Sequence, residues 1–227
     1  MQPKWRSQSR QNKFKYLLRI YPNMSLQKPS VKYFMGQMTS ELSNLAARIS
    51  DESIERLTSE ILKERRIYLA GAGRSGLIAR AFAMRLMHLG MESYVVGETV
   101  TPAMRKDDML IVISGSGETK TMIDNAVTAK NIGGLVCLIT GHPESKIAAI
   151  ADLVICLPAE AHNAELDSTY EIRQLKGESK SLSMPLMRLG TLFETSALVF
   201  ADAFIASIIE IKHCDIKEVV DRFSNIQ

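Results

Sequence analysis

From Thr39 onward, the hydrophobic positions of the chain follow a helical spacing first and a strand-like clustering afterwards. Leucine and isoleucine recur at near-helical intervals over 39–64, which predicts one or two amphipathic helices. Short apolar runs then alternate with helical segments. The runs that we expect to form strands are 67–70, 93–96, 109–113, 135–139 and 153–156. Near-continuous apolar strands separated by helices are typical of a parallel sheet with both faces covered, so the pattern predicts an α/β fold.

The segments between these runs complete the expected architecture. We expect helices that reach about Leu89 and about Asn131 after two glycine-rich turns, and further helices at 144–151, at 191–212 and at the end of the chain. The segment 159–183 is polar and has few apolar anchors. No repeat of 20–50 residues is visible, and residues 39–227 are therefore predicted to form one α/β domain with helical ends.

Residues 1–38 lack sustained periodicity and are rich in proline, glutamine, serine and asparagine. We expect them to form a basic, disordered extension. Three other interpretations stay open for this segment: an upstream extension of the gene with the working start at Met24 or Met35, a targeting peptide, and an RNA-binding arm.

The charge of the chain is unevenly distributed. Residues 1–40 carry eight basic side chains and no acidic one, whereas the remaining 187 residues carry 20 basic and 25 acidic side chains. The isoelectric point of 8.7 therefore reflects the N-terminal segment, and we expect no nucleic-acid binding by the folded body. No uncharged apolar stretch of about 18 residues is present, so no membrane span is expected. Three widely spaced cysteines argue against a disulfide framework or a structural zinc site and favour a cytoplasmic protein.

The first glycine-rich turn follows the first expected strand and reads Gly71-Ala72-Gly73-Arg74-Ser75-Gly76. This GxGxxG pattern is typical of dinucleotide-binding folds, and Glu98, 22 residues beyond Gly76, lies where such folds place the acid that binds the ribose hydroxyls. Taken alone, the turn leaves an NAD site as an open alternative.

The second turn, which follows the third expected strand, favours a different ligand. It reads Ser114-Gly115-Ser116-Gly117-Glu118-Thr119, with three hydroxyls interleaved with two glycines. Serine and threonine cap helices without any ligand, but one hydroxyl is enough for a cap. Glycines that expose backbone N–H groups, hydroxyl donors and a helix N-terminus together suit a phosphate group. Gly73, Arg74 and Ser75 of the first turn can converge on the same substrate, because open α/β sheets bind ligands at the carboxyl ends of their strands.

Together with further segments, these turns resemble the sugar isomerase (SIS) family of phosphosugar-binding domains, and within it the 6-phospho-3-hexuloisomerases. The segments that carry the resemblance are the first turn followed by 80–90, the segment 96–102, the serine-rich turn, and Gly190-Thr191-Leu192-Phe193-Glu194. The resemblance covers about 39–227. It implies a three-layer αβα sandwich with a five-stranded parallel, flavodoxin-like sheet, no metal or redox cofactor, and a homodimer or homotetramer with sites near subunit interfaces.

The resemblance also implies the roles of individual residues. The phosphate of a phosphorylated ketohexose is expected on Ser114, Gly115, Ser116, Gly117, Glu118 and Thr119, with further substrate contacts at Gly73, Arg74 and Ser75. Glu194 is implied as the base that shuttles a proton between neighbouring carbons through an enediol; from its position alone, it could equally be a glutamate that favours a helix N-terminus. The segments 159–183 and 184–190 look longer than is usual in the family.

Two other functions remain as alternatives to the isomerase. The same fold serves non-catalytic phosphosugar-binding regulators, but 1–38 is too short and irregular for an attached DNA-binding module. An NAD-dependent oxidoreductase would need a substrate domain, for which the body has no spare sequence. His88 is expected to serve packing or an interface, or alternatively a neighbouring subunit's site, and His142, in a Gly-His-Pro turn, is expected at the surface.

Overall fold

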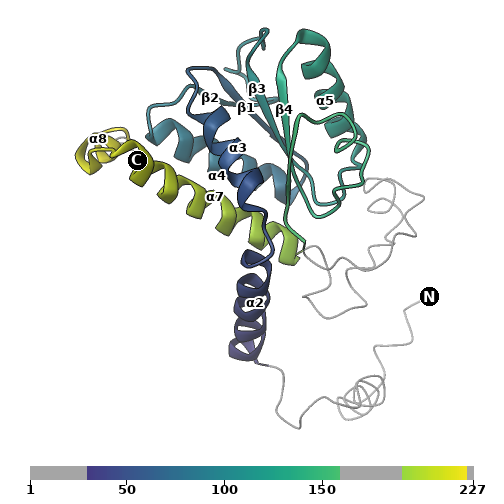
Figure 1. Ribbon diagram of the computed structural model, residues 1–227, viewed down its shortest axis with the longest axis vertical. Coiled ribbons are helices and arrows are strands. Elements are labelled where there is room, and N and C mark those ends of the chain that lie inside the picture. Colours follow the sequence, from purple (N-terminus) through teal and green to yellow (C-terminus); the bar gives the residue numbers. More distant parts are fainter. Residues whose placement is uncertain (1–29, 159–190, 224–227) are drawn as a thin grey trace, which may run out of the picture. The chain divides into compact units, whose positions relative to one another are not determined.

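The computed structural model describes residues 30–158 and 191–223 (Figure 1). By its internal contacts the chain divides into residues 1–37 and residues 38–227, and the folded body is the second unit. Its elements, in chain order, are α2 (Val31–Ala46, which begins in the first unit), α3 (Asp51–Ile61), β1 (Ile67–Gly71), α4 (Arg74–His88), β2 (Ser93–Val95), β3 (Met109–Ile113), α5 (Lys120–Ile132), β4 (Leu135–Thr140), β5 (Leu153–Cys156), α7 (Thr191–Lys212) and α8 (Ile216–Asp221).

The five strands form one parallel sheet in the order β2-β1-β3-β4-β5, which confirms the predicted α/β class. In the register of the sheet, Gly71 at the end of β1 pairs with Ile113 at the end of β3, and Ile113 pairs in turn with Ile139 of β4. The strand order reverses between β1 and β3. Ligands of open α/β sheets bind at such a switch point, outside the carboxyl ends of the strands.

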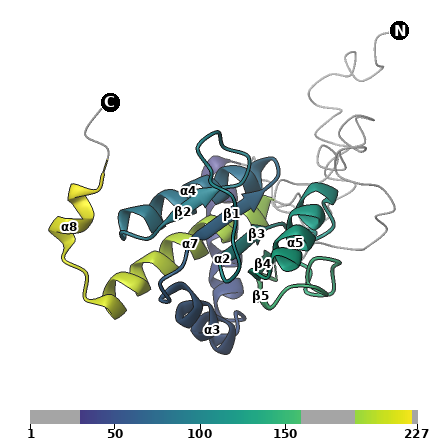
Figure 2. The same cartoon turned by 90° about the horizontal axis from the view of Figure 1, so that it is seen from above.

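Both faces of the sheet are buried, because alternate residues of each strand point to opposite sides. Ile67 and Leu69 of β1 belong to one apolar core, which α3, α4 and α7 complete, whereas Tyr68 and Ala70 belong to a second core beneath α5. The helices therefore lie in two layers with the sheet between them (Figure 1, Figure 2). This is the three-layer sandwich expected above.

Helix α7 is the one helix among the described residues that is long and apolar enough to cross a membrane by length and composition. One of its faces is nevertheless part of the core beside α4, where the rings of Phe82 and Phe204 meet edge to face with their centroids 6.1 Å apart. Phe193, Phe200 and Ile208 are buried along the same face, as is typical of a helix in a protein core.

One expected helix boundary and one expected helix were wrong. Helix α2 begins at Val31 and not near Thr39, because its first turns expose apolar side chains such as Tyr33 and Met35 and so show no amphipathic pattern. The expected helix at 144–151 is a series of turns: Ala149 and Ala151 donate to carbonyls four residues back, but Ile150 donates to Ile147. The polar segment 159–183, the segment 184–190 and most of the basic extension lie outside the described residues.

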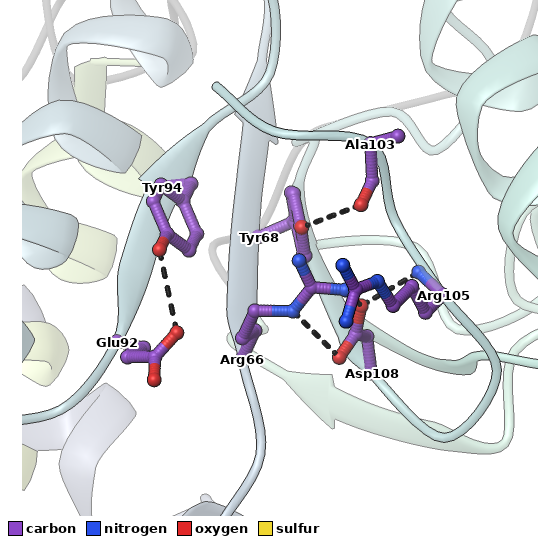
Figure 3. A network of polar contacts seen from close by, with 7 residues as sticks. All are labelled: Arg66, Tyr68, Glu92, Tyr94, Ala103, Arg105 and Asp108. Carbon is purple, nitrogen blue, oxygen red and sulfur yellow. Dashed lines mark hydrogen bonds and ion pairs between the residues drawn. The ribbon is translucent and has the colours of Figure 1, made fainter. Parts of the chain in front are cut away.

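A partly buried ion pair joins the starts of β1 and β3 at the edge of the sheet opposite the glycine-rich turns (Figure 3). Arg66 donates from Nε and Nη2 to the two carboxylate oxygens of Asp108, over 3.2 and 2.6 Å, and the backbone N–H of Arg105 donates to the same carboxylate. The guanidinium also lies over the ring of Tyr68. Removing one partner of such a pair leaves the other charge desolvated and unpaired.

We therefore expect Asp108→Asn to lower the melting temperature by several degrees, because the amide cannot accept both guanidinium bonds. The measurement is thermal unfolding followed by circular dichroism. Glu92→Gln is the matched control, because among the described residues the exposed Glu92 carboxylate accepts a single hydrogen bond, from the Tyr94 hydroxyl. Equal melting temperatures for the two variants would contradict a stabilising role for the pair.

Candidate active site

The two glycine-rich turns lie side by side, because they leave the sheet at residues that pair across β1 and β3. Helix α4 begins directly after the first turn and α5 directly after the second. Neither helix has an acidic residue in its first turn, and neither has a side-chain cap hydrogen bond at its N-cap, Gly73 or Thr119. Two helix N-termini, each with a positive partial charge, thus converge where an anion can bind.

The first turn brings α4 into direct contact with the end of β1. A Cβ on Gly71 would lie 2.6 Å from the backbone carbonyl of Ser75, so only glycine permits this approach. As a result Ser75 is buried, whereas the side chain of Arg74 is 55% exposed and reaches across the site. Gly73, with φ of 57°, is the N-cap between them.

The serines of the second turn hold the turn together. The N–H of Gly117 donates to Ser114 Oγ over 3.1 Å, and the N–H of Glu118 donates to Ser116 Oγ over 3.2 Å. A hydroxyl that accepts in this way still has its own O–H to donate. Thr119, in contrast, makes no cap hydrogen bond with its side chain, so capping does not explain its hydroxyl.

Glu118 is paired with Lys146 of the turn that follows β4. Its carboxylate accepts from the backbone N–H of Lys146 and pairs with the Lys146 ammonium, both over 2.8 Å. Burial raises the pKa of Glu118, but the hydrogen bonds and charge of Lys146, with a smaller contribution from His142, together lower it by more, so the pKa lies below its ordinary value. A carboxylate paired in this way repels a neighbouring phosphate less than a free one.

Glu194 lies in the first turn of α7, and the fold brings it to the first glycine-rich turn. Its Oε2 lies 3.1 Å from Arg74 Nε, as an ion pair without the alignment of a hydrogen bond, and Oε2 has no hydrogen-bond partner among the described residues. The carboxylate side chain is 21% exposed. Burial raises the pKa of Glu194 above its ordinary value, and the charge of Arg74 lowers it by less.

The residue before Glu194 connects α7 to the second turn. Phe193 is buried, and a Cβ on Gly115 would lie 2.9 Å from its ring. The structure therefore brings Glu194, Arg74 and the serine-rich turn together at one end of the sheet.

A third segment contributes to the site, and the sequence interpretation missed it. The turn after β4 carries His142, which is half-buried, with Nδ1 2.8 Å from the carbonyl oxygen of Gly115. It also carries Ser145, whose buried hydroxyl lies so close to Gly117 (φ 61°) that a Cβ there would overlap it. The signal that could have found this segment is the order of the strands. Because β4 pairs with β3, the residues that follow the two strands must be neighbours.

Two other residues singled out in the sequence have different surroundings. Glu98, the candidate ribose-binding acid, is exposed and pairs with Arg80 of α4 over 2.8 Å. His88 is buried against the ring of Phe223, and burial lowers its pKa, with a further contribution from Arg85. Within residues 30–158 and 191–223, no group of three histidine, cysteine or acidic side chains could hold a metal ion.

Comparison with known proteins places the chain in a family. Residues 60–174 match the SIS domain. The chain is 38% identical over 194 residues to a 3-hexulose-6-phosphate isomerase of Bacillus subtilis (86% of this chain, 97% of the relative) and 39% identical over 173 residues to one of Methanocaldococcus jannaschii (76% and 83%). A crystal structure from Methanococcus jannaschii, described as inferring a function of 3-hexulose-6-phosphate isomerase, matches with a TM-score of 0.66 at 36% identity, over 84% of this chain and 97% of the other. The chain therefore belongs to the SIS domain family of phosphosugar isomerases.

Proposed function

We propose that this protein interconverts 3-hexulose 6-phosphate and fructose 6-phosphate through an enediol intermediate, with no metal or redox cofactor. The observation that carries the proposal is the position of Glu194: a largely buried carboxylate paired with Arg74, one residue from a ring packed on the serine-rich turn. The identity to named isomerases supports the same reaction. We assign the activity to residues 39–227, in the cytoplasm, and none to the basic segment 1–38.

The substrate phosphate is proposed to bind over the turn from Ser114 to Thr119. The converging N-termini of α4 and α5, without acidic residues in their first turns, support an anion there. Anchoring the phosphate holds the reacting carbons against the base, so binding energy from a remote group lowers the entropic cost of the reaction.

Glu194 is proposed to remove the proton from C2 of the 3-hexulose, which forms a 2,3-enediolate. The carboxyl then returns a proton to C3 while a proton passes from O2 to O3, and the carbonyl is left at C2. One carboxylate can serve both carbons because they are adjacent. A pKa raised by burial makes Glu194 a stronger base, and Arg74 is placed to stabilise the negative oxygen of the intermediate.

We also propose that the protein is a homodimer or homotetramer. Leu77, Met84 and Met87 of α4 are 64%, 48% and 42% exposed, and their spacing of seven and three residues puts them on one face of the helix. An apolar stripe of this kind on a helix of the folded body is typical of a protein interface.

The first test of this function is Glu194→Gln. Conversion of 3-hexulose 6-phosphate to fructose 6-phosphate is expected to fall by roughly 100- to 10,000-fold, the usual cost of losing a general base. Turnover equal to that of the unchanged protein would exclude Glu194 as the base.

The same variant is expected to be more stable than the unchanged protein at neutral pH. Since the folded pKa of Glu194 is raised, its charged form costs stability, and this cost grows as the pH rises from the unfolded value of 4.5 through the folded value. The gain should therefore vanish below pH 4.5 in chemical denaturation. Glu118→Gln is the matched control with the opposite sign, because the pKa of Glu118 is lowered in the fold.

Arg74→Gln is expected to move the acidic limb of the kcat/KM profile to higher pH, because the positive charge that lowers the pKa of Glu194 is lost. Arg74→Lys keeps a charge and should move the limb less. A limb that stays in place in Arg74→Gln would show that the ion pair does not tune the base.

Met84→Arg is expected to shift the protein to a smaller assembly, because a charge in the apolar stripe of α4 opposes its burial. Light scattering coupled to size exclusion measures the mass. Val127→Arg, an exposed apolar position on α5 in the opposite layer, is the control and should keep the larger mass. If Met84→Arg leaves the mass unchanged, the interface lies elsewhere.

A further inference from the structure

The carbonyl of Gly115 is the most heavily bonded group of the serine-rich turn. It accepts the N–H of Gly141 over 3.1 Å, the hydroxyl of Thr140 over 3.2 Å and a ring nitrogen of His142 over 2.8 Å. All three donors come from the end of β4 and the turn that follows it. A carbonyl oxygen has two lone pairs, so three donors leave it little freedom to turn.

Fixing this carbonyl also fixes the N–H on the other side of the same peptide. In a planar trans peptide, the C=O of Gly115 and the N–H of Ser116 point in opposite directions. The N–H of Ser116 is thus aimed away from the turn after β4, and among the described residues it has no acceptor. An N–H without an acceptor at the centre of an anion-binding turn is a donor available to a phosphate oxygen.

The peptide between Gly117 and Glu118 is held in the same manner. The carbonyl of Gly117 accepts the N–H of Ile147 over 3.2 Å, and the N–H of Glu118 on its far side donates to Ser116 Oγ. Because Ser116 Oγ accepts this bond, its own hydrogen is directed elsewhere. The turn after β4 therefore orients the N–H and the hydroxyl of Ser116.

The hydrogen bond to the Gly115 carbonyl defines which ring nitrogen of His142 carries a hydrogen. A carbonyl only accepts, so Nδ1 carries the hydrogen. The backbone N–H of His142 in turn donates to the Thr140 hydroxyl over 3.1 Å, and Thr140 is fully buried. The imidazole is thus tied to a rigid point of the fold, and its hydrogen bond polarises the peptide so that the Ser116 N–H becomes a better donor.

We infer that His142 is a positioning residue of the phosphate site, which acts through the Gly115–Ser116 peptide to aim the Ser116 N–H at the substrate phosphate. The inference rests on the proposed function, because it takes a sugar phosphate as the ligand. It adds a role for a side chain that does not touch the substrate itself.

The test compares His142→Ala with His142→Asn in the full-length protein. The alanine variant loses the donor, and the expected result is a KM for 3-hexulose 6-phosphate raised by about 3- to 10-fold with kcat nearly unchanged, since a bond to the non-reacting phosphate affects ground and transition states equally. The asparagine amide places an N–H where Nδ1–H was, so the KM should return toward that of the unchanged protein. Affinity for inorganic phosphate, measured by calorimetry, should follow the same order.

His213→Asn, an exposed position with φ of 49° that asparagine tolerates, is the matched control and should change neither KM nor phosphate affinity. An unchanged KM and phosphate affinity in His142→Ala would overturn the inference. A lowered kcat and melting temperature with unchanged KM, not rescued by asparagine, would assign His142 a purely structural role and also overturn it. If the unchanged protein does not isomerise the substrate while phosphate affinity still follows His142, the proposed function fails and the positioning role stands.

Discussion

The site depends on two places where the backbone comes so close to another segment that only glycine, which has no Cβ, fits. The first turn of α4 rests on the end of β1 because Gly71 has no Cβ, and the turn after β4 packs beneath Gly117, where the backbone has a positive φ. These contacts bring together the N-termini of α4 and α5 and the turn after β4, which is hydrogen-bonded to the serine-rich turn. An anion can therefore be held by N–H groups, hydroxyls and helix ends, and this is how we propose that a body with more acidic than basic side chains binds a phosphate.

The carboxylate that we propose as the base, Glu194, illustrates the opposing demands of stability and chemistry. Burial of Glu194 raises its pKa and so costs stability whenever the group is charged, yet the same burial makes it a better base. The partly exposed Arg74 offsets this cost only in part. A more deeply buried Arg74 would lower the pKa of Glu194 further and offset more of this cost, whereas a fully solvated partner would leave the pKa raised by burial.

The sequence was sufficient for the sheet and the two turns, because uninterrupted apolar runs and glycine patterns are local signals. It was insufficient where the signal is nonlocal. The exposed apolar residues at the start of α2 have no periodicity, the turns at 144–151 are held by bonds to their surroundings, and His142 acquires its partner only when β4 lies beside β3. Glu194 is a comparable case: no spacing along the chain shows that α7 returns to the end of β1, and family resemblance supplied that expectation.

One peptide relates the two halves of the proposed reaction. The ring of Phe193 packs on the Cα of Gly115, while the turn after β4 holds the carbonyl of the same residue. The proposed phosphate site and the proposed base, Glu194, are therefore both held by contacts to Gly115, the base through the neighbouring Phe193. In 3-hexulose 6-phosphate the distance from the phosphate to C2 and C3 is set by the carbon chain, so proton transfer requires a matching fixed distance in the protein. Binding a phosphosugar needs only the phosphate site, whereas isomerising it also needs the base at a fixed distance from that site. The shared contacts to Gly115, more than the fold, therefore distinguish a site that can isomerise a phosphosugar from one that only binds it.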